Sequence, residues 1–399
     1  MEEKYQFGFA LGRDHALSIA EICAHLEKTH IKFSINQPVD EILIVTSENK
    51  DLEFININNL GGTIKLFRIL GKTKLNNIFE FVIKNFYPNQ TEKRINFGIS
   101  SYGLGTTKEL YQLGKNIKEY FSKSSLSARF VASQSTILSS VIITENKLLD
   151  RGFEVILIKE RDEIIVGQTI STQDYKAYSF RDFGRPRRDD LNGMIPPKLA
   201  QIMINLSKIN TDQILYDPFC GSGTILQEAD LLGYQKIYGS DINKQQIRDT
   251  KANLAWLEQN CYANKIPDDN LFISDILNPS RLVKTDAIVS EGYLGEPIRK
   301  NHEKATVSAN SLAEFYLKAL NEIKNMLNTN GKIVIAIPFF IVQKNYVYLP
   351  LLDRLEQIGL KIEKPLSDAI KVKLPGRGNL SYHRPEQFVG REILILQKK

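Results

Sequence analysis

The 399-residue sequence predicts an α/β protein in which two small α+β units precede a domain built on a parallel sheet. Apolar strands and helical stretches alternate from about residue 209 onward, the pattern of a parallel sheet covered on both faces. Before that point, strands and helices come in two shorter groups. The hydrophobic content of 42% and the absence of a biased tract fit several domains, each with its own core.

The first expected unit covers residues 1–60 and is predicted as strand, helix, strand. Residues 5–12 alternate between apolar and polar side chains, and residues 41–46 form a compact β-rich run. Between them, Ile19, Ile22 and Leu26 fall at helical spacing. A Gly61-Gly62 turn is expected to end this unit.

The second expected unit covers residues 61–170. Ile95, Phe97 and Ile99 alternate as in a half-buried strand, and Leu110 and Ile117 mark one face of a helix. Between residues 61 and 130, twelve Lys and Arg stand against four Glu, a net charge of +8 in a chain whose total is +6. Such charge suits a polyanionic partner, although a solvated lysine-rich surface remains the alternative.

Residues 171–208 have little apolar periodicity and are interpreted as a connector whose last part, after Pro196-Pro197, restarts as a helix. The remaining residues, 209–399, are predicted to form the parallel-sheet domain. Its expected strands are residues 214–216, 237–239, 271–273, 287–289 and 332–337.

Several classes of protein are disfavoured. The three cysteines, Cys23, Cys220 and Cys261, form no CxxC pair, so neither a metal site nor a disulfide framework is expected. No run of eighteen apolar residues predicts a membrane span, and the first residues do not resemble a signal peptide. We therefore expect a cytoplasmic protein without a metal or a membrane partner.

The strongest local signal is DPFCGSGTILQEA at residues 217–229, which follows an expected strand and opens an expected helix. Gly221 and Gly223 allow a tight turn and a close approach of a ligand to the backbone. Asp241 ends the second strand, where it can accept hydrogen bonds from ribose hydroxyls, and Asp275 ends the third, within reach of an adenine amino group. A GxGxxG phosphate fingerprint is absent, and a glycine turn of some other α/β fold remains the alternative.

The segment DPFCGSGT is similar to the S-adenosylmethionine motif of amino-group methyltransferases. Together with GRDHALSIAEICAHLE, RINFGISSYG, the connector and YHRPEQFVGREILIL, it resembles the THUMP-containing tRNA guanosine-N2 methyltransferases of archaea and eukaryotes that act at position ten. This resemblance covers nearly the whole chain. It implies a ferredoxin-like domain at residues 1–60, a THUMP RNA-binding domain at 61–170 and a Rossmann-type class I methyltransferase domain at 209–399.

The resemblance also implies S-adenosyl-L-methionine as cofactor and tRNA as partner of a monomeric enzyme that methylates an exocyclic amino group of guanosine. The cofactor residues that it implies are Asp217, Phe219, Gly221, Ser222, Gly223, Thr224, Asp241, Ile242 and Asp275. Two alternatives remain open. One is a methyltransferase that acts on another tRNA base or on DNA adenine, and the other is a catalytically inactive RNA-binding homologue.

The expected catalytic motif departs from the family. Such enzymes carry Asp, Asn or Ser, then Pro-Pro and an aromatic residue at the end of the fourth strand, whereas residues 290–293 are Ser-Glu-Gly-Tyr. We expect Ser290 and the backbone carbonyl of Glu291 to accept hydrogen bonds from the target amine, and Tyr293 to stack on a flipped base. The Glu291 side chain is either a further acceptor or a residue without a role. If the loop adopts the geometry usual in the family, activity is expected to survive or rise when proline is restored at positions 291 and 292.

Arginines outside these motifs are candidate RNA contacts. Three lie in the connector, Arg185, Arg187 and Arg188, and two in a polar loop near the end of the chain, Arg377 and Arg384. Because surface arginines are commonly inert, a solvated surface is the alternative for each of them.

Overall fold

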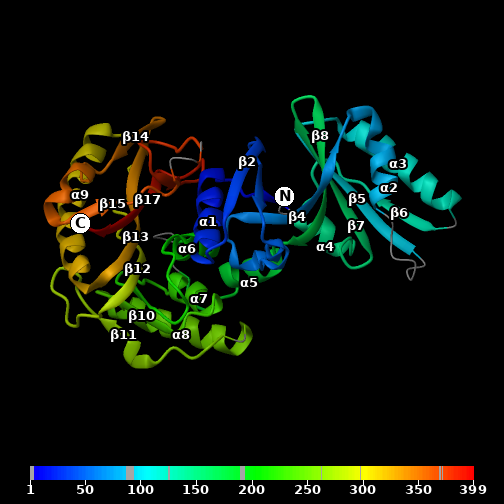
Figure 1. Ribbon diagram of the computed structural model, residues 1–399. Coiled ribbons are helices and arrows are strands. Elements are labelled where there is room, and N and C mark those ends of the chain that lie inside the picture. The colour runs from blue at the N-terminus through cyan, green and yellow to red at the C-terminus, as the bar shows by residue number, and fades with distance from the viewer. Residues whose placement is uncertain are drawn as a thin grey trace. The chain divides into compact units, whose positions relative to one another are not determined.

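The computed structural model describes residues 4–86, 94–124, 126–188, 194–261, 263–296, 298–367, 370 and 372–399. The chain divides into two compact units (Figure 1). Unit 1 consists of Met1–His15, His30–Asn58 and Gly62–Ala177, and unit 2 of Ala16–Thr29, Asn59–Gly61 and Tyr178–Lys399. The units interleave in sequence, because the helix at His15–Lys28 belongs almost wholly to unit 2.

Unit 1 is built on one eight-stranded sheet with the strand order β2-β3-β1-β4-β8-β7-β5-β6. The strands are β1 Tyr5–Leu11, β2 Phe33–Val39, β3 Ile42–Ser47, β4 Thr63–Thr73, β5 Arg94–Tyr102, β6 Ser127–Val131, β7 Gly152–Glu160 and β8 Glu163–Thr172. Its helices are α2 Ile78–Asn85, α3 Thr107–Lys123 and α4 Ser140–Glu145. The antiparallel pair β1–β4 joins the two predicted α+β units into a single sheet.

The position of α3 follows from its sequence. Thr106 and Glu109 form a capping box that satisfies free backbone N–H groups at its first turn. Ile117 and Phe121 on one face are buried, and Phe121 lies edge-on to Phe97 of β5 at 6.1 Å between ring centroids. Such aromatic contacts fix the helix on the sheet.

The positive charge of unit 1 is distributed unevenly between surface and core. On α3, the four lysines Lys108, Lys115, Lys118 and Lys123 are exposed. Lys65 of β4, in contrast, is buried and pairs with the buried Glu154 at 2.6 Å. The surface charge of this region is therefore lower than the sequence count suggests.

Unit 2 is built on a nine-stranded sheet with the order β11-β10-β9-β12-β13-β17-β15, while β14 pairs with β13 and β16 with β17. The strands are β9 Ile214–Asp217, β10 Lys236–Asp241, β11 Leu271–Ile273, β12 Thr285–Glu291, β13 Leu327–Val342, β14 Asn345–Tyr348, β15 Leu360–Ile362, β16 Leu380–Tyr382 and β17 Val389–Lys398. Strands β9 to β13 pair in parallel, and β17 runs antiparallel to β13. The strand order reverses between β9 and β12, where ligands bind in open α/β sheets.

The helices of unit 2 are α1 His15–Lys28, α6 Pro197–Leu206, α7 Thr224–Leu231, α8 Lys244–Cys261 and α9 His302–Met326, and α5 Tyr175–Phe183 begins in unit 1 and continues into unit 2. Helix α9 contributes Tyr316, Leu320 and Ile323 to the main core of this unit, together with Ile288 of β12 and Ile335 of β13. The predicted α/β fold class is thus confirmed.

The details around residue 180 differ from the expectation. The segment interpreted as a connector contains α5, on which Tyr178 and Arg181 are buried. Its helical period was hidden because one of the two buried side chains is an arginine. The domain limits at residues 60, 170 and 208 stay a prediction, and the compact units follow other limits.

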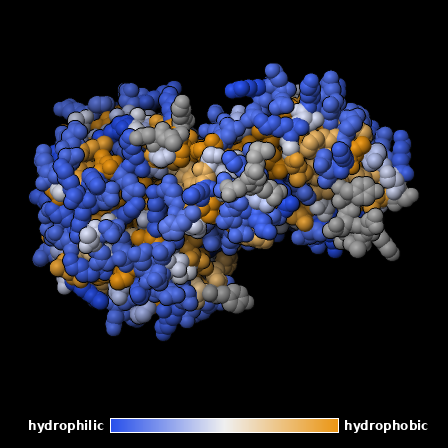
Figure 2. Space-filling model, in the orientation of Figure 1, coloured by the Kyte–Doolittle hydropathy of each residue, from blue (hydrophilic) through white to orange (hydrophobic). Residues whose placement is uncertain are grey.

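Hydrophilic side chains cover most of the face seen in Figure 2. Within the described ranges, none of the helices has both the length and the apolar content that crossing a membrane requires.

Candidate functional site

A glycine-rich loop joins the end of β9 to the start of α7. Gly221 and Gly223 have φ angles of 52° and 88°, in the left-handed region that favours glycine. A Cβ built on Gly221 meets no atom within 4 Å, whereas one on Gly223 would lie 2.9 Å from Cγ2 of Thr250. The first glycine therefore leaves open space beside the backbone, and the second permits close packing against α8.

Three side chains from neighbouring elements hold this loop. The carboxylate of Asp241 accepts a hydrogen bond from the Gly221 N–H at 3.1 Å, and the Thr250 hydroxyl donates to the Gly221 carbonyl at 2.6 Å. The Asn253 amide donates to the Ser222 carbonyl at 2.8 Å. Because these bonds come from β10 and α8, the loop conformation is fixed by the sheet and by the second helix.

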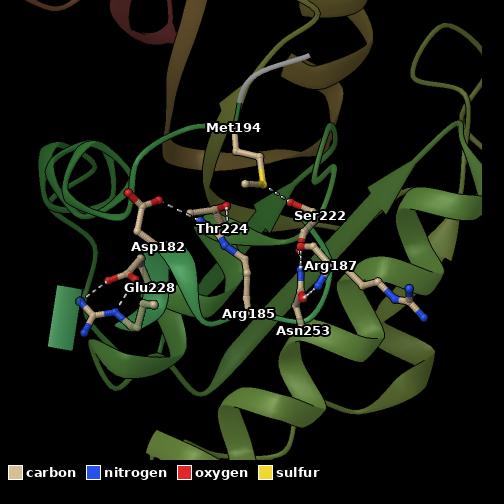
Figure 3. A network of polar contacts seen from close by, with 9 residues as sticks. Asp182, Arg185, Arg187, Met194, Ser222, Thr224, Glu228 and Asn253 are labelled. Atoms are coloured by element: carbon tan, nitrogen blue, oxygen red, sulfur yellow. Dashed lines mark hydrogen bonds and ion pairs between the residues drawn. The ribbon is translucent and has the colours of Figure 1, made fainter. Parts of the chain in front are cut away.

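The segment after α5 also reaches the loop (Figure 3). Arg185 donates to the hydroxyl of Thr224, the first residue of α7, at 2.6 Å, and it pairs with Asp182 at 3.4 Å. The backbone N–H of Arg187 donates to Asn253 at 3.0 Å, and the same Asn253 amide donates back to the Arg187 carbonyl at 2.9 Å. Asn253 thus ties the connector and the loop together.

Two further contacts complete this network. Arg181 makes a double hydrogen bond to the buried Glu228 of α7, at 2.7 and 3.1 Å. The Ser222 hydroxyl donates to the sulfur of Met194 at 3.3 Å. The helix that follows the glycine loop is therefore anchored by side chains that the sequence analysis assigned to a linker.

A cavity of about 730 Å³ opens at the carboxyl ends of the parallel strands. Its cofactor wall is formed by residues 217–222, Thr224, Ile225, residues 241–243 and residues 274–276. Its strand-end wall is formed by residues 291–295. The other lining residues are Met194, Ile195, Gln246, Phe315, residues 387–389 and Arg391.

The cofactor wall fits S-adenosylmethionine. The open side of Gly221 admits a ligand to the backbone, and Asp241 and Asp275 bring carboxylates that can accept hydrogen bonds from ribose hydroxyls or an amino group. Phe219 and Ile242 add apolar surface at the same wall. The volume lies in the range of ordinary small-molecule sites.

Burial shifts the acidity of the carboxyl groups here. Burial raises the pKa of Asp241, and hydrogen bonds from the N–H groups of Asn243 and Gly221 oppose this shift. Burial raises the pKa of Asp217 further, to about 7, while a hydrogen bond from Ser290 lowers it. A carboxyl group that titrates near neutrality within a cavity is a candidate for proton transfer.

Ser290 does not line the cavity. Its side chain is fully buried, and its hydroxyl donates to Oδ1 of Asp217 at 2.5 Å. The predicted direct hydrogen bond to a target amine therefore needs correction: the hydroxyl is used within the protein, and the group that it positions, Asp217, lines the cavity.

Glu291 pairs with the nearly buried Arg391 of β17. Both residues line the cavity, and neither alternative considered for Glu291 described this partner. The charge of the carboxylate is balanced by a residue one hundred positions further along the chain. The pair links the end of β12 to β17 on the far side of β13.

Two backbone contacts hold the residues that follow. The Gly292 N–H donates to the Ala336 carbonyl at 3.1 Å, and the Tyr316 hydroxyl donates to the Tyr293 carbonyl at 2.9 Å. The Tyr293 side chain is 57% exposed and lines the cavity. Its ring is therefore accessible, as a stacking residue requires.

The condition set for proline at positions 291 and 292, that the loop has the geometry usual in the family, is not met at Gly292. A Cβ there would lie 2.3 Å from the Tyr316 hydroxyl, and proline would also remove the N–H that bonds Ala336. Tyr316 fills the space that a larger residue would need, so the loop is built around glycine.

The candidate RNA-binding arginines fall into two groups. Arg185 is only 3% exposed, and Arg377 makes two hydrogen bonds to Glu392, at 2.9 and 2.6 Å, and one to the Leu349 carbonyl. We therefore correct the assignment of these two, because each is used inside unit 2. Arg187, Arg188 and Arg384 are exposed.

Sequence reasoning missed part of the cavity. Met194, Phe315 and Arg391 line it, but each lies in a segment without a recognisable motif of its own. Arg391 falls within YHRPEQFVGREILIL, which carried the resemblance but was assigned no role. Phe315 sits on α9, where its apolar spacing is indistinguishable from that of a core residue.

The sheet order, the reversal beside the glycine loop and the carboxylates at the strand ends define a Rossmann-type fold with a nucleoside-type site. Residues 185–341 match a family model described as "RMKL-like, methyltransferase domain", and residues 48–252, just over half of the chain, match one described as "DNA methylase". The class is that of the class I methyltransferases. The chain belongs to the methyltransferases that these family models describe, and its predicted cofactor, S-adenosylmethionine, is confirmed.

Curated relatives are named tRNA (guanine(10)-N2)-dimethyltransferase. One, from Methanocaldococcus jannaschii, is 32% identical over 149 residues, which cover 37% of this chain and 38% of the relative. Another, from Methanothermobacter thermautotrophicus, is 28% identical over 180 residues, 45% of this chain and 49% of the relative. The chain thus spans less than half the length of these relatives, and they confirm the resemblance that the motifs indicate.

The fold of the whole chain is similar to that of TrmN from Thermus thermophilus, with a TM-score of 0.55, 13% identity and full coverage of both chains. A possible methylase from Clostridium difficile 630 gives a TM-score of 0.52 at 13% identity, over 100% of this chain and 99% of the other. At these identities the likeness concerns the fold.

Proposed function

We propose that this protein is a cytoplasmic, single-chain methyltransferase that transfers a methyl group from S-adenosylmethionine to the exocyclic amino group of a guanosine in tRNA. The observation that carries the proposal is one cavity with two unlike walls: a cofactor wall at Gly221 and Asp241, and a strand-end wall with the exposed ring of Tyr293. The names of the curated relatives support guanosine in tRNA as the target.

When bound, the cofactor would supply a methyl carbon on a sulfonium, which the amine lone pair would attack in line while the carbon–sulfur bond breaks and the neutral thioether leaves. The protein's part is mainly to position the base and to expose that lone pair. We assign base stacking to Tyr293 and amine orientation to the backbone carbonyl of Glu291. The Glu291–Arg391 ion pair and the Tyr316 hydrogen bond to the Tyr293 carbonyl hold this segment in place.

The amine must lose a proton once its nitrogen carries the new methyl group. The carboxyl group of Asp217 lines the cavity and has a pKa raised by burial to about 7. We assign this carboxyl group as the acceptor of the proton. Ser290 is the positioning residue, because its hydroxyl donates to Oδ1 of Asp217 at 2.5 Å and so fixes the orientation of the carboxyl group. In the family motif, the first residue accepts a hydrogen bond from the target amine. In this chain we assign part of that role to the Asp217–Ser290 pair.

Unit 1 would hold the tRNA. The exposed lysines on α3 form a row of cations, and Tyr111 on the same helix is exposed as well. Phosphate neutralisation by such lysines gives affinity that falls as salt rises.

The proposal is tested by incubating the protein with unmodified tRNA and methyl-labelled S-adenosylmethionine, followed by mass spectrometry of the nucleosides. The expected product is N2-methylated guanosine. Label in another base of the tRNA would favour the alternative of a different tRNA target. In a parallel incubation with DNA, label in adenine would favour the alternative that the "DNA methylase" match supports. Binding of RNA without any transfer of label would mean an inactive homologue.

A further inference from the structure

Two phenylalanines on the surface of unit 2 require an explanation. Phe183, at the end of α5, is 62% exposed, and Phe180, one turn earlier, is 44% exposed. The only tryptophan of the chain, Trp256 of α8, lies beside them with its ring centroid 4.9 Å from that of Phe180. Large aromatic side chains grouped on a surface commonly mark a binding site.

Contacts within unit 2 hold this aromatic group in place. The two rings of Phe180 and Trp256 lie at 34° to each other, a tilted stack. A Cβ on Gly184 would come within 2.6 Å of the Phe180 carbonyl and 3.3 Å of the Trp256 ring, so glycine lets the chain turn closely over both. The rings are therefore held in place before any partner arrives, which reduces the entropy cost of binding.

Arginines border the rings. The guanidinium carbon of Arg188 lies 5.2 Å from the centroid of the Phe183 ring. The Arg187 side chain is 61% exposed and lies 3.7 Å from Asp249, and Figure 3 shows its guanidinium directed away from the polar network. An exposed pair at this distance contributes little, so Arg187 can exchange its partner for a phosphate at small cost. Rings combined with arginines fit a nucleic acid strand.

Helix α8 connects this surface to the cavity. Gln246 lines the cavity, Asp249 contacts Arg187, Asn253 binds the Arg187 backbone and Trp256 stacks on Phe180. These positions are spaced three, four and three residues apart, so they share one face of the helix. Ten residues of helix span about 15 Å, a distance of a few nucleotides.

We propose that Phe180, Phe183, Trp256, Arg187 and Arg188 form a stacking surface for unpaired RNA nucleotides that flank the methylated one. The inference rests on the proposed function for the identity of the strand as RNA. Base–aromatic stacking tolerates any base, while the arginines contact the backbone. A flipped target nucleotide leaves its neighbours unstacked, and such a surface replaces the stacking that they lose.

The single tryptophan gives a direct test in the full-length protein. We expect its fluorescence to be quenched as unmodified tRNA is added, and likewise with a single-stranded oligoribonucleotide of about ten nucleotides. Phe183→Leu keeps an apolar side chain but removes the ring, and should weaken oligonucleotide binding about fivefold to a hundredfold. Phe183→Tyr should bind as the wild type does. Leu282→Ala, at a residue that is 59% exposed elsewhere in unit 2, is the matched control and should change nothing.

Unchanged tryptophan emission at RNA concentrations that saturate binding by filter retention would overturn the proposal, as would wild-type affinity in Phe183→Leu. Equal quenching by a fully paired RNA duplex would also overturn it, because a duplex offers no free base face. The two hypotheses fail separately. Quenching without methyl transfer would contradict the proposed function alone, and methyl transfer to guanosine with unchanged emission would contradict this surface alone.

Discussion

The two walls of the cavity are held by different kinds of contact. On the cofactor wall, side chains of three other segments hold the loop: Asp241 and Asn253 bond the backbone of Gly221 and Ser222, and Arg185 bonds the hydroxyl of Thr224. On the strand-end wall, a backbone bond from Gly292, the Tyr316 hydroxyl and the Glu291–Arg391 ion pair hold the chain. The cofactor wall is thus held by side chains that bond the loop from three segments, while the strand-end wall depends on a glycine, one tyrosine and one ion pair.

The difference shows where the sequence can change. The Gly221 and Ser222 carbonyls are bonded by neighbouring side chains, so replacing one of these side chains leaves a buried polar group without a partner. The strand-end wall has lost both prolines of the family motif, and Tyr316 occupies the space beside Gly292. Under the proposed function, more contacts hold the wall that binds the cofactor than hold the wall that contacts the substrate base.

The largest effect is expected at Gly221. Gly221→Leu places a side chain in the open space beside the loop. It also requires leucine to adopt the left-handed backbone conformation of Gly221. Binding of S-adenosylmethionine should be lost in calorimetry, while circular dichroism stays unchanged. Gly378→Leu is the matched control, since Gly378 also has a positive φ, 93°, and open space. Wild-type cofactor affinity in Gly221→Leu would remove this loop from the binding site.

Asp217 should make stability depend on pH. An aspartate in water has a pKa of 3.8, whereas burial raises the pKa of Asp217 to about 7 in the folded protein. Between these two values folding takes up a proton, so rising pH destabilises the fold. Asp217→Asn lacks this penalty. Its free energy of unfolding relative to the wild type should rise from pH 4 to pH 7 by at most about 4 kcal/mol and then level off.

Chemical denaturation at several pH values measures this difference. Asp269→Asn, which alters an exposed carboxyl group, is the control. A pH-independent difference between Asp217→Asn and the wild type would mean that Asp217 ionises as it does in water. The same variant should also lose the rise in methyl-transfer rate that we expect as the pH passes 7, because its side chain cannot accept a proton.

Asn253→Ala tests the network that joins the connector to the cofactor wall. It removes the donor to the carbonyls of Ser222 and Arg187, and we expect a loss of about 3 kcal/mol in the free energy of unfolding together with weaker cofactor binding. Asn260→Ala, on the exposed part of the same helix, should have little effect on either quantity. If cofactor affinity is unchanged in Asn253→Ala, the loop is held by other means.

The smallest effect is expected on the strand-end wall. Tyr316→Phe removes the hydrogen bond to the Tyr293 carbonyl and should cost about 1 kcal/mol of stability. Gly292→Ala should cost more, because its Cβ meets the Tyr316 hydroxyl. Tyr316→Phe removes that atom but leaves two ring carbons at 2.6 and 2.8 Å, so the double variant should lose slightly less than the sum of the single losses in thermal unfolding. Additive losses would show that the two positions do not interact.

The sequence predicted the parts of the site that are encoded locally. The strands at residues 214–216 and 237–239, the glycine turn and Asp241 follow one another at fixed spacing, so a linear pattern is enough to place them. The parts it missed depend on contacts between distant segments. Arg391 forms an ion pair with Glu291, one hundred residues earlier in the chain. The buried Arg185 bonds Thr224, thirty-nine residues later. Charged residues in an irregular segment predict exposure, and only the packing reveals the opposite.

In the proposed function, one cavity brings the cofactor loop together with a guanine held by Tyr293. This arrangement is tested most directly by the yield of N2-methylguanosine in a single turnover with tRNA, compared among the wild type, Tyr293→Phe and Tyr293→Ala, with cofactor affinity measured on the same preparations. Loss of a base stack worth about 1–3 kcal/mol predicts that Tyr293→Ala transfers the methyl group about fivefold to a hundredfold more slowly at limiting tRNA. Tyr293→Phe should transfer at a near-normal rate, and all three proteins should bind the cofactor with equal affinity. Equal transfer rates in all three proteins would contradict a role of Tyr293 in holding the base.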